Sequence, residues 1–232
     1  MSLSLVTDPF ANFDPEWLRR HFDVFAAFKE HFVADLTQPI EGFVSKSHRS
    51  AVRRALQKVD VEWCAEPATY LDVWVELFGH LMRRHNISGV RAFSREGFAR
   101  QLRTPGLVMF KALFQGEIVG LDLWYVHGDV AYGHLVAMSP EGYRLRASYA
   151  LKWYLLHYFA EKVHWLDFGG GAGTEAAGND GLSRFKEGWS TGTRTVYFCG
   201  RILNRERYCE LAEAKGDVGG RYFPVYREGE FD

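Results

Sequence analysis

The middle of the chain carries the clearest hydrophobic patterns. Three runs rich in β-branched and aromatic residues follow one another, at Leu107–Phe114, Ile118–Val126 and Val130–Met138, and only short connections that contain glycine separate them. Such connections between strand-like runs predict an antiparallel meander. Beyond the meander, apolar residues recur at helical spacing from Ala147 to Phe159, which predicts a helix with one buried stripe.

Shorter patterns flank this centre. Before it, the sequence predicts a helix over Glu16–Lys29, a strand at His31–Leu36, a helix over Ser45–Val59, a strand at Val61–Cys64, an amphipathic helix from Leu71 to Met82 and a helix capped by Ser94. After it, the sequence predicts a strand at Val163–Phe168, a short helix around Gly181–Trp189 and a strand at Thr193–Ile202. A meander followed by a crossover helix and a parallel strand predicts an α/β fold: a mixed sheet flanked by helices.

Along the chain, we expect one compact domain at residues 46–205. Residues 1–45 are weakly patterned and are expected to form an N-terminal extension. Residues 206–232 carry seven acidic against four basic side chains and are expected to form an acidic tail. The length of 232 residues is ample for one domain with a sizeable core.

The amino-acid composition indicates which kinds of binding partner and which compartment to expect. The 28 Lys and Arg residues are balanced by 29 Asp and Glu residues, so bulk charge does not favour duplex DNA. The three cysteines include no C-x-x-C pair, which indicates a reducing compartment. The N-terminus has no signal-peptide pattern, and no stretch approaches the roughly 20 apolar residues of a membrane span. We therefore expect a cytoplasmic protein without membrane or DNA partners.

Several common chemistries find no motif here. The sequence contains no G-x-S-x-G, no H-E-x-x-H and no G-x-x-x-x-G-K-[ST]. His80 and His85 are five residues apart, which does not suit one metal ion on a helix face. We predict no metal and no permanently bound cofactor.

A glycine-rich segment follows the strand predicted at Val163–Phe168. The run from Gly169 to Gly173 is similar to the first loop of a methyltransferase that uses S-adenosylmethionine, but that fold needs several further strand–helix units. Only 59 residues follow Gly173, so the topology excludes that fold. Asp167, directly before the run, is either a functional carboxylate at a strand end or a cap of the turn.

Two motifs carry a family resemblance. The segment Asp167-Phe-Gly-Gly, followed by Phe185-Lys186-Glu-Gly-Trp189, resembles the Fem-type branch of the GNAT superfamily, and Ser47–Leu56 resembles the basic helix that opens the same domain. The resemblance covers roughly residues 45–202. It implies an N-acyl- or aminoacyltransferase, and it makes residues 1–45 the remnant of a first GNAT-like half.

The resemblance also implies a site. In GNAT folds a cleft opens where the fourth and fifth strands splay, which corresponds here to Val130–Met138 and Val163–Phe168. Strand alternation places Tyr132, His134 and Val136 on one face, and His134 is then the candidate base. A hydrogen-bonded histidine within the sheet is the alternative.

Other residues complete the predicted site. Lys186 and Asp167 join His134 as catalytic candidates, and Lys186 is a candidate for stabilising an oxyanion; the alternative is an ordinary surface lysine. Tyr132, Phe185, Arg49 and Arg53 are candidates for substrate binding, although Phe185 can instead anchor its helix.

The binding site for the acyl donor is the part of the predicted site that the sequence defines least. The usual acetyl-CoA loop of GNAT enzymes, Arg/Gln-x-x-Gly-x-Gly/Ala, is matched poorly by Ser139–Ser148. Arg144, Arg146, Ala147 and Ser148 lie at the start of the predicted long helix and are the candidates for binding the phosphates of acyl-CoA as co-substrate. A face with five basic side chains on the Ser45–Val59 helix can instead contact tRNA phosphates or an anionic, sugar- or nucleotide-linked amine, or be a solvated surface.

The sequence thus predicts an N-acyltransferase that acts on an amine. An aminoacyltransferase that uses charged tRNA and a catalytically silent ligand-binding module of the same fold remain the alternatives.

Overall fold

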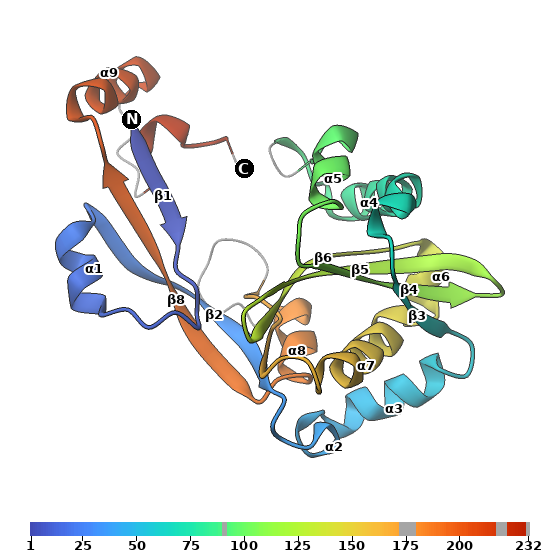
Figure 1. Ribbon diagram of the computed structural model, residues 1–232. Helices are drawn as coiled ribbons and strands as arrows, with labels where there is room; N and C mark the ends of the chain where they lie inside the picture. The colour runs from blue at the N-terminus through green and yellow to red at the C-terminus, as the bar shows by residue number, and fades with distance from the viewer. Residues whose placement is uncertain (90–91, 172–179, 217–221, 231–232) are drawn as a thin grey trace. The chain divides into compact units, whose positions relative to one another are not determined.

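The computed structural model describes residues 1–89, 92–171, 180–216 and 222–230 (Figure 1). In chain order its helices and strands are β1 (Ser2–Val6), α1 (Pro15–His21), β2 (Val24–Asp35), α2 (Ile40–Phe43), α3 (Lys46–Ala55), β3 (Asp60–Cys64), α4 (Leu71–His85), α5 (Arg95–Gln101), β4 (Leu107–Phe114), β5 (Glu117–His127), β6 (Val130–Met138), α6 (Pro140–Arg144), α7 (Ala147–Phe159), β7 (Trp165–Asp167), α8 (Gly181–Glu187), β8 (Gly192–Ile202) and α9 (Arg205–Lys215). The predicted α/β class is correct. No helix in these ranges is long and apolar enough to cross a membrane.

The chain divides into two compact units. The larger unit comprises residues 32–169 and 181–192, and the smaller unit comprises residues 1–31, 170–180 and 193–232. These boundaries differ from the ranges expected from the sequence, because the first 31 residues and the C-terminal segment belong to one unit.

The larger unit is built on a mixed sheet in which the strand order is β2-β7-β6-β5-β4-β3. The predicted meander is confirmed, because β4, β5 and β6 pair antiparallel in sequence order. Figure 1 shows α4 and α5 over one face of the meander and α3 and α7 over the other. Each face therefore has its own hydrophobic core, one against α4 and α5 and one against α3 and α7.

The smaller unit contains β1, β8, the first part of β2, α1 and α9. Strand β1 pairs antiparallel with β8, from Ser2 opposite Ile202 to Val6 opposite Phe198. The sequence prediction of a helix over Glu16–Lys29 was wrong in its second half, because α1 ends at His21 and β2 begins at Val24. The apolar run there joins a sheet, where Phe25 stacks on Tyr197 with 5.0 Å between ring centroids.

The parallel pairing between β6 and β7 is short. Val130, Ala131 and Tyr132 of β6 pair with Trp165, Leu166 and Asp167 of β7. Strand β6 then continues to Met138, whereas β7 ends at Asp167. The predicted parallel arrangement is confirmed, and the ladder joins only the first part of β6 to β7.

A bulge follows this ladder at once. On β5, Trp124 lies opposite Gly133 and the next residue, Leu123, lies opposite Leu135. His134 is therefore an extra residue in β6. Such a bulge locally disrupts the pairing and turns the residues beyond it relative to those before it.

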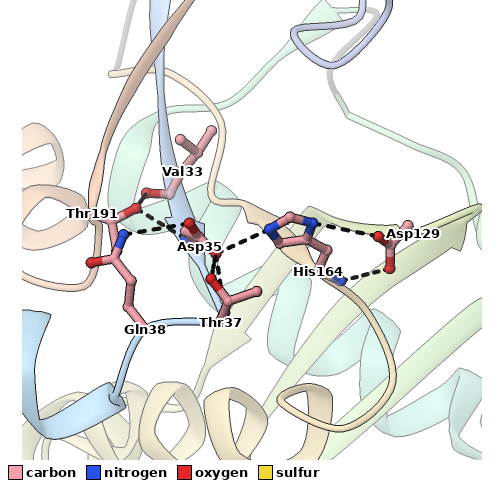
Figure 2. A network of polar contacts seen from close by, with 7 residues as sticks. All are labelled: Val33, Asp35, Thr37, Gln38, Asp129, His164 and Thr191. Atoms are coloured by element: carbon pink, nitrogen blue, oxygen red, sulfur yellow. Dashed lines mark hydrogen bonds and ion pairs between the residues drawn. The ribbon is translucent and has the colours of Figure 1, made fainter.

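A polar network holds the other end of the ladder (Figure 2). The imidazole of His164, just before β7, lies between two carboxylates: Nε2 is 3.1 Å from Asp35 Oδ1 and Nδ1 is 3.7 Å from Asp129 Oδ2. The backbone N–H of His164 also donates to Asp129 Oδ1 over 2.7 Å. The hydroxyl of Thr37, with a contribution from His164, lowers the pKa of Asp35. The network thus connects the end of β2, the β5–β6 turn and the start of β7.

A buried ion pair lies between β5 and α7. Lys152 Nζ donates to Asp122 Oδ2 over 2.6 Å, and Trp124 Nε1 donates to Asp122 Oδ1 over 2.9 Å. The ammonium also lies 4.8 Å from the centroid of the Trp124 ring. Burial raises the pKa of Asp122, and the Lys152 charge opposes that change. The pair fixes the indole that packs under Gly133, where an added Cβ would lie 3.4 Å from Trp124.

Removing one partner of this pair should destabilise the fold strongly. Asp122→Ala leaves the Lys152 ammonium buried without its anion, and the expected loss is about 3–5 kcal/mol of unfolding free energy in urea titrations. The double variant Asp122→Leu with Lys152→Met should recover most of it, because apolar groups need no counter-ion. As the control, Asp72→Ala breaks the exposed pair with Arg95 and should cost less than about 1 kcal/mol. Equal losses for Asp122→Ala and Asp72→Ala would contradict the assignment.

Candidate functional site

The predicted base, His134, lies at the bulge just past the β6–β7 ladder. Its Nε2 is 3.1 Å from Oε1 of Gln101, and its ring centroid is 5.0 Å from that of Tyr125. His134 is exposed, and desolvation by the protein on its other side lowers its pKa, which favours the neutral ring. A neutral imidazole at this place can accept a proton.

The expected alternation around His134 was wrong. Tyr132 lies opposite Tyr125 of β5, but Val136 lies opposite Asp122. Directly opposed residues share a face, and positions 122 and 125 of β5 point to opposite faces. The extra residue at the bulge therefore separates Tyr132 from Val136, which strict alternation had placed together.

Asp167 is the last residue of β7, and it is buried. Its Oδ1 accepts the backbone N–H of Gly169 over 2.7 Å, and Gly169 has φ +73°, a conformation that glycine adopts without strain. The carboxylate therefore caps the turn that starts the glycine run, which was the alternative reading. Its catalytic role stays a prediction. Residues 172 and 173 of the run lie outside the described residues.

Lys186 reaches this same turn from α8. Its Nζ lies 3.4 Å from the point where a Cβ on Gly169 would stand. The side chain is half-buried. The structure thus brings the ammonium of Lys186 to the carboxyl end of β7, next to the turn that Asp167 caps, and its catalytic role stays a prediction.

Helix α8 is held in place by His48, a residue that the sequence analysis assigned no role. His48 Nε2 donates to the backbone carbonyl of Phe185 over 2.9 Å, and Nδ1 lies 2.9 Å from Ser45 Oγ. A Cβ on Gly188 would lie 2.3 Å from the His48 ring, so only glycine permits this approach. The signal was present, because positions 48, 52 and 55 share one face of α3 and all are buried.

Phe185, predicted to bind substrate, is part of this anchor. Its ring packs 5.1 Å from Tyr149, 5.6 Å from His48 and 6.0 Å from Trp189. The packing fixes Phe185 against the core, so it positions the neighbouring Lys186.

Arg49 and Arg53 of α3, predicted to bind substrate, have no described contact at the carboxyl end of β7. Arg49 donates to the backbone carbonyl of Glu41, and Arg53 is exposed. The face of α3 that bears Arg53 is turned to solvent, since the opposite face packs into the core. Neither residue is brought to the end of β7 by a contact in the described part of the chain.

The predicted donor segment links β6 to α7. Arg144 forms an exposed ion pair with Glu141, which raises the pKa of Arg144, and Arg146 adopts φ 58° directly before α7. Ala147 is buried and Ser148 half-buried in the first turn. A helix N-terminus presents backbone N–H groups that favour an anion. The segment places Arg144 and Arg146 before the N-terminus of α7, with the Arg144 guanidinium already paired with Glu141, and phosphate binding there stays a prediction.

The donor segment is held rigidly against the sheet. Gly142 approaches the Val119 carbonyl so closely that a Cβ would lie 2.2 Å from its oxygen.

Within the described ranges, no group of three or more His, Cys, Asp or Glu residues is arranged to hold a metal ion.

Comparison with known proteins identifies the family to which this chain belongs. The model of the acetyltransferase (GNAT) domain matches residues 43–187, which is more than half of the chain. The comparison with curated proteins found no match.

Solved structures of similar fold include FemX, with a TM-score of 0.62 and 15% identity over 80% of this chain and 68% of that chain. Another is the C-terminal domain (DUF2156) of a putative lysylphosphatidylglycerol synthetase from Agrobacterium fabrum, with a TM-score of 0.62 and 15% identity over 83% of this chain and 65% of that one. L-PGS from Bacillus licheniformis has a TM-score of 0.56 and 17% identity, and the alignment covers 78% of this chain and 62% of that chain. At these identities the likeness concerns the fold, and the chain spans about two thirds of these proteins.

The buried His48 should make stability depend on pH. Burial lowers the pKa of His48 below the value of about 6.5 in an unfolded chain. Its contribution is therefore complete above about pH 6.5 and is lost as the pH falls through the lower folded-state value. His48→Gln stays neutral and can still donate to the Phe185 carbonyl, so it should lose less stability than the parent between about pH 7.5 and about pH 5.5. Urea titrations at both pH values test this, and equal losses for the two proteins would contradict it.

Proposed function

Because this chain belongs to the GNAT acetyltransferase family, we propose that it transfers an acyl group from an acyl-CoA-type donor to an amine. The observation that carries the proposal is the short β6–β7 ladder, which ends at Tyr132 and Asp167 beside the His134 bulge and the Lys186 ammonium. Because the ladder stops there, the later part of β6 has no β7 partner. His134 and Lys186 lie at the end of the ladder where the pairing stops.

The reaction would join the acceptor nitrogen to the acyl carbon and break the bond from that carbon to the donor sulfur. The amine must first lose a proton, because an ammonium has no lone pair. We assign this proton to His134, whose lowered pKa keeps the ring neutral near pH 7. When the tetrahedral intermediate collapses, the nitrogen loses its second proton, and the thiolate that leaves takes up one proton.

Lys186 would stabilise the negative charge that develops on the acyl oxygen. When the amine attacks, negative charge develops on the acyl oxygen, and a fixed positive group stabilises that charge more than it stabilises the starting carbonyl. Packing by Phe185 and His48 holds α8, so the ammonium is positioned before the reaction begins. Asp167 would contribute by shaping the turn at Gly169.

The acceptor is proposed as a small amine, a sugar- or nucleotide-linked amine among them. The basic face of α3, which is turned to solvent, favours the second candidate, an aminoacyl-tRNA donor, in which an ester replaces the thioester. Lys46, Arg53, Arg54 and Lys58 are exposed there and can meet phosphates. Native mass spectrometry after incubation with acyl-CoA species, and separately with charged tRNA, tests both candidates. Binding without transfer in either case would support the silent ligand-binding module.

Binding of CoA should be weak and should depend on the donor segment. Arg144→Ala with Arg146→Ala removes two charges before α7, and the dissociation constant for CoA should rise about tenfold in calorimetry, as for the loss of one charge-assisted hydrogen bond. Arg95→Ala, which removes an exposed guanidinium on α5, serves as the control and should leave the constant unchanged. An unchanged constant in the double variant would favour the tRNA donor.

Replacing Lys186 should reduce turnover while the fold survives. Lys186→Met keeps the length and apolar packing of the side chain and removes the charge, so kcat should fall on the order of 100-fold. Arg184→Met, on the same helix, is the matched control and should leave kcat near that of the parent. Steady-state kinetics with the identified acceptor, together with a melting curve, provide the measurement. A raised KM with normal kcat would reassign Lys186 to substrate binding.

A further inference from the structure

The C-terminal end of α5 is fixed against β5 next to the His134 bulge. The hydroxyl of Tyr125 donates to the backbone carbonyl of Gln101, the last residue of α5, over 3.2 Å. Phe98 and Leu102, on either side of Gln101 along the chain, are 2% and 3% exposed in the core under α4 and α5. The backbone of Gln101 is thus anchored by a hydrogen bond and by two buried neighbours.

The side chain of Gln101 then meets the imidazole of His134. Its Oε1 lies 3.1 Å from His134 Nε2. With the amide oriented so that Oε1 faces the ring, this oxygen accepts the hydrogen bond, and the hydrogen of the neutral ring is then on Nε2. Nδ1 is then the nitrogen with a lone pair. Tyr125, with its ring centroid 5.0 Å away, packs against the imidazole.

We propose that Gln101 is a positioning residue that fixes the neutral tautomer of His134, with hydrogen on Nε2, so that Nδ1 receives the proton of the acceptor ammonium. This inference rests on the proposed function. When the proton moves, the nitrogen–hydrogen bond of the acceptor breaks, a bond to Nδ1 forms, and the Nε2 hydrogen keeps its contact with Gln101. The hydrogen bond therefore serves both protonation states.

A neutral partner suits this role. Gln101 of α5 and Tyr125 of β5 contact His134, and desolvation by the surrounding protein lowers its pKa. No charged side chain in the described part of the chain contributes to that change. A carboxylate in place of the amide would stabilise the imidazolium and raise the pKa of His134, so that less of the ring would be free to accept a proton near pH 7.

The first experiment observes the tautomer directly and requires no substrate. Nitrogen-15 NMR of the histidine side chains distinguishes protonated from unprotonated ring nitrogens, and His134→Asn identifies the signals of His134. We expect the Nε2–H tautomer in the parent protein and a mixture in Gln101→Met. Gln57→Met, which changes an exposed glutamine after α3, is the matched control and should leave the tautomer unchanged. An Nδ1–H tautomer in the parent, or an unchanged tautomer in Gln101→Met, would overturn the proposal.

The second experiment measures the pH dependence. NMR titration of Gln101→Glu should give a His134 pKa higher than that of the parent by roughly one unit. Once an acceptor is known, the acidic limb of kcat/KM should move to higher pH by the same amount, and Gln101→Met should lower kcat about tenfold with little change in KM. A structural role alone would leave the pH profile in place.

The outcomes separate this inference from the function on which it rests. If His134→Asn keeps normal kcat, the base of the proposed reaction is wrong, whereas the NMR result on the tautomer stands by itself. If His134→Asn is inactive but Gln101→Met retains the kcat and pH profile of the parent, the proposed function survives and the positioning role of Gln101 is refuted.

Discussion

The three-pair parallel ladder between β6 and β7 is the constraint on which the rest of the site depends. Its start is fixed by the His164 network, which joins the β5–β6 turn, the end of β2 and the residue before β7. Its end is fixed by the bulge at His134 and by the turn that Asp167 caps. A longer ladder would pair the later part of β6 with β7, and a shorter one would not hold the strands parallel. The site therefore follows from where hydrogen bonding between two strands stops.

Each candidate group at this end of the ladder is supported from a different face of the sheet. His134 is held by Gln101, whose chain neighbours Phe98 and Leu102 belong to the core under α4 and α5. Lys186 is held through α8 by His48, whose cluster belongs to the core of α3 and α7. Both supports are neutral hydrogen bonds whose partners are anchored by buried apolar neighbours.

Much of the fold follows from the sequence, because its signals are local. The meander and the long α7 helix follow from periodicity and short connections, and the parallel position of β7 follows from the crossover. The helix predicted over Glu16–Lys29 was wrong because Val24–Phe28 suits either structure until β8 pairs with it. The bulge at His134 was missed because an extra residue leaves no mark on a short alternating pattern. Its consequence, the separation of Tyr132 from Val136, is visible only in the strand register.

The residues missed by sequence reasoning share a physical cause. His48 and Gln101 act through partners 137 and 33 positions away along the chain, so no local spacing reveals them. The buried Asp122–Lys152 pair is of the same kind, with partners 30 positions apart. This pair holds Trp124 directly under Gly133, the residue before the bulge, so that the strand is supported from below where its regular pairing breaks. The contacts of His48 and of the Asp122–Lys152 pair are costly to bury unless complete, and all three contacts lie where the backbone of the site must not move. Long-range polar contacts thus determine the geometry of a site whose scaffold is determined by local apolar patterns.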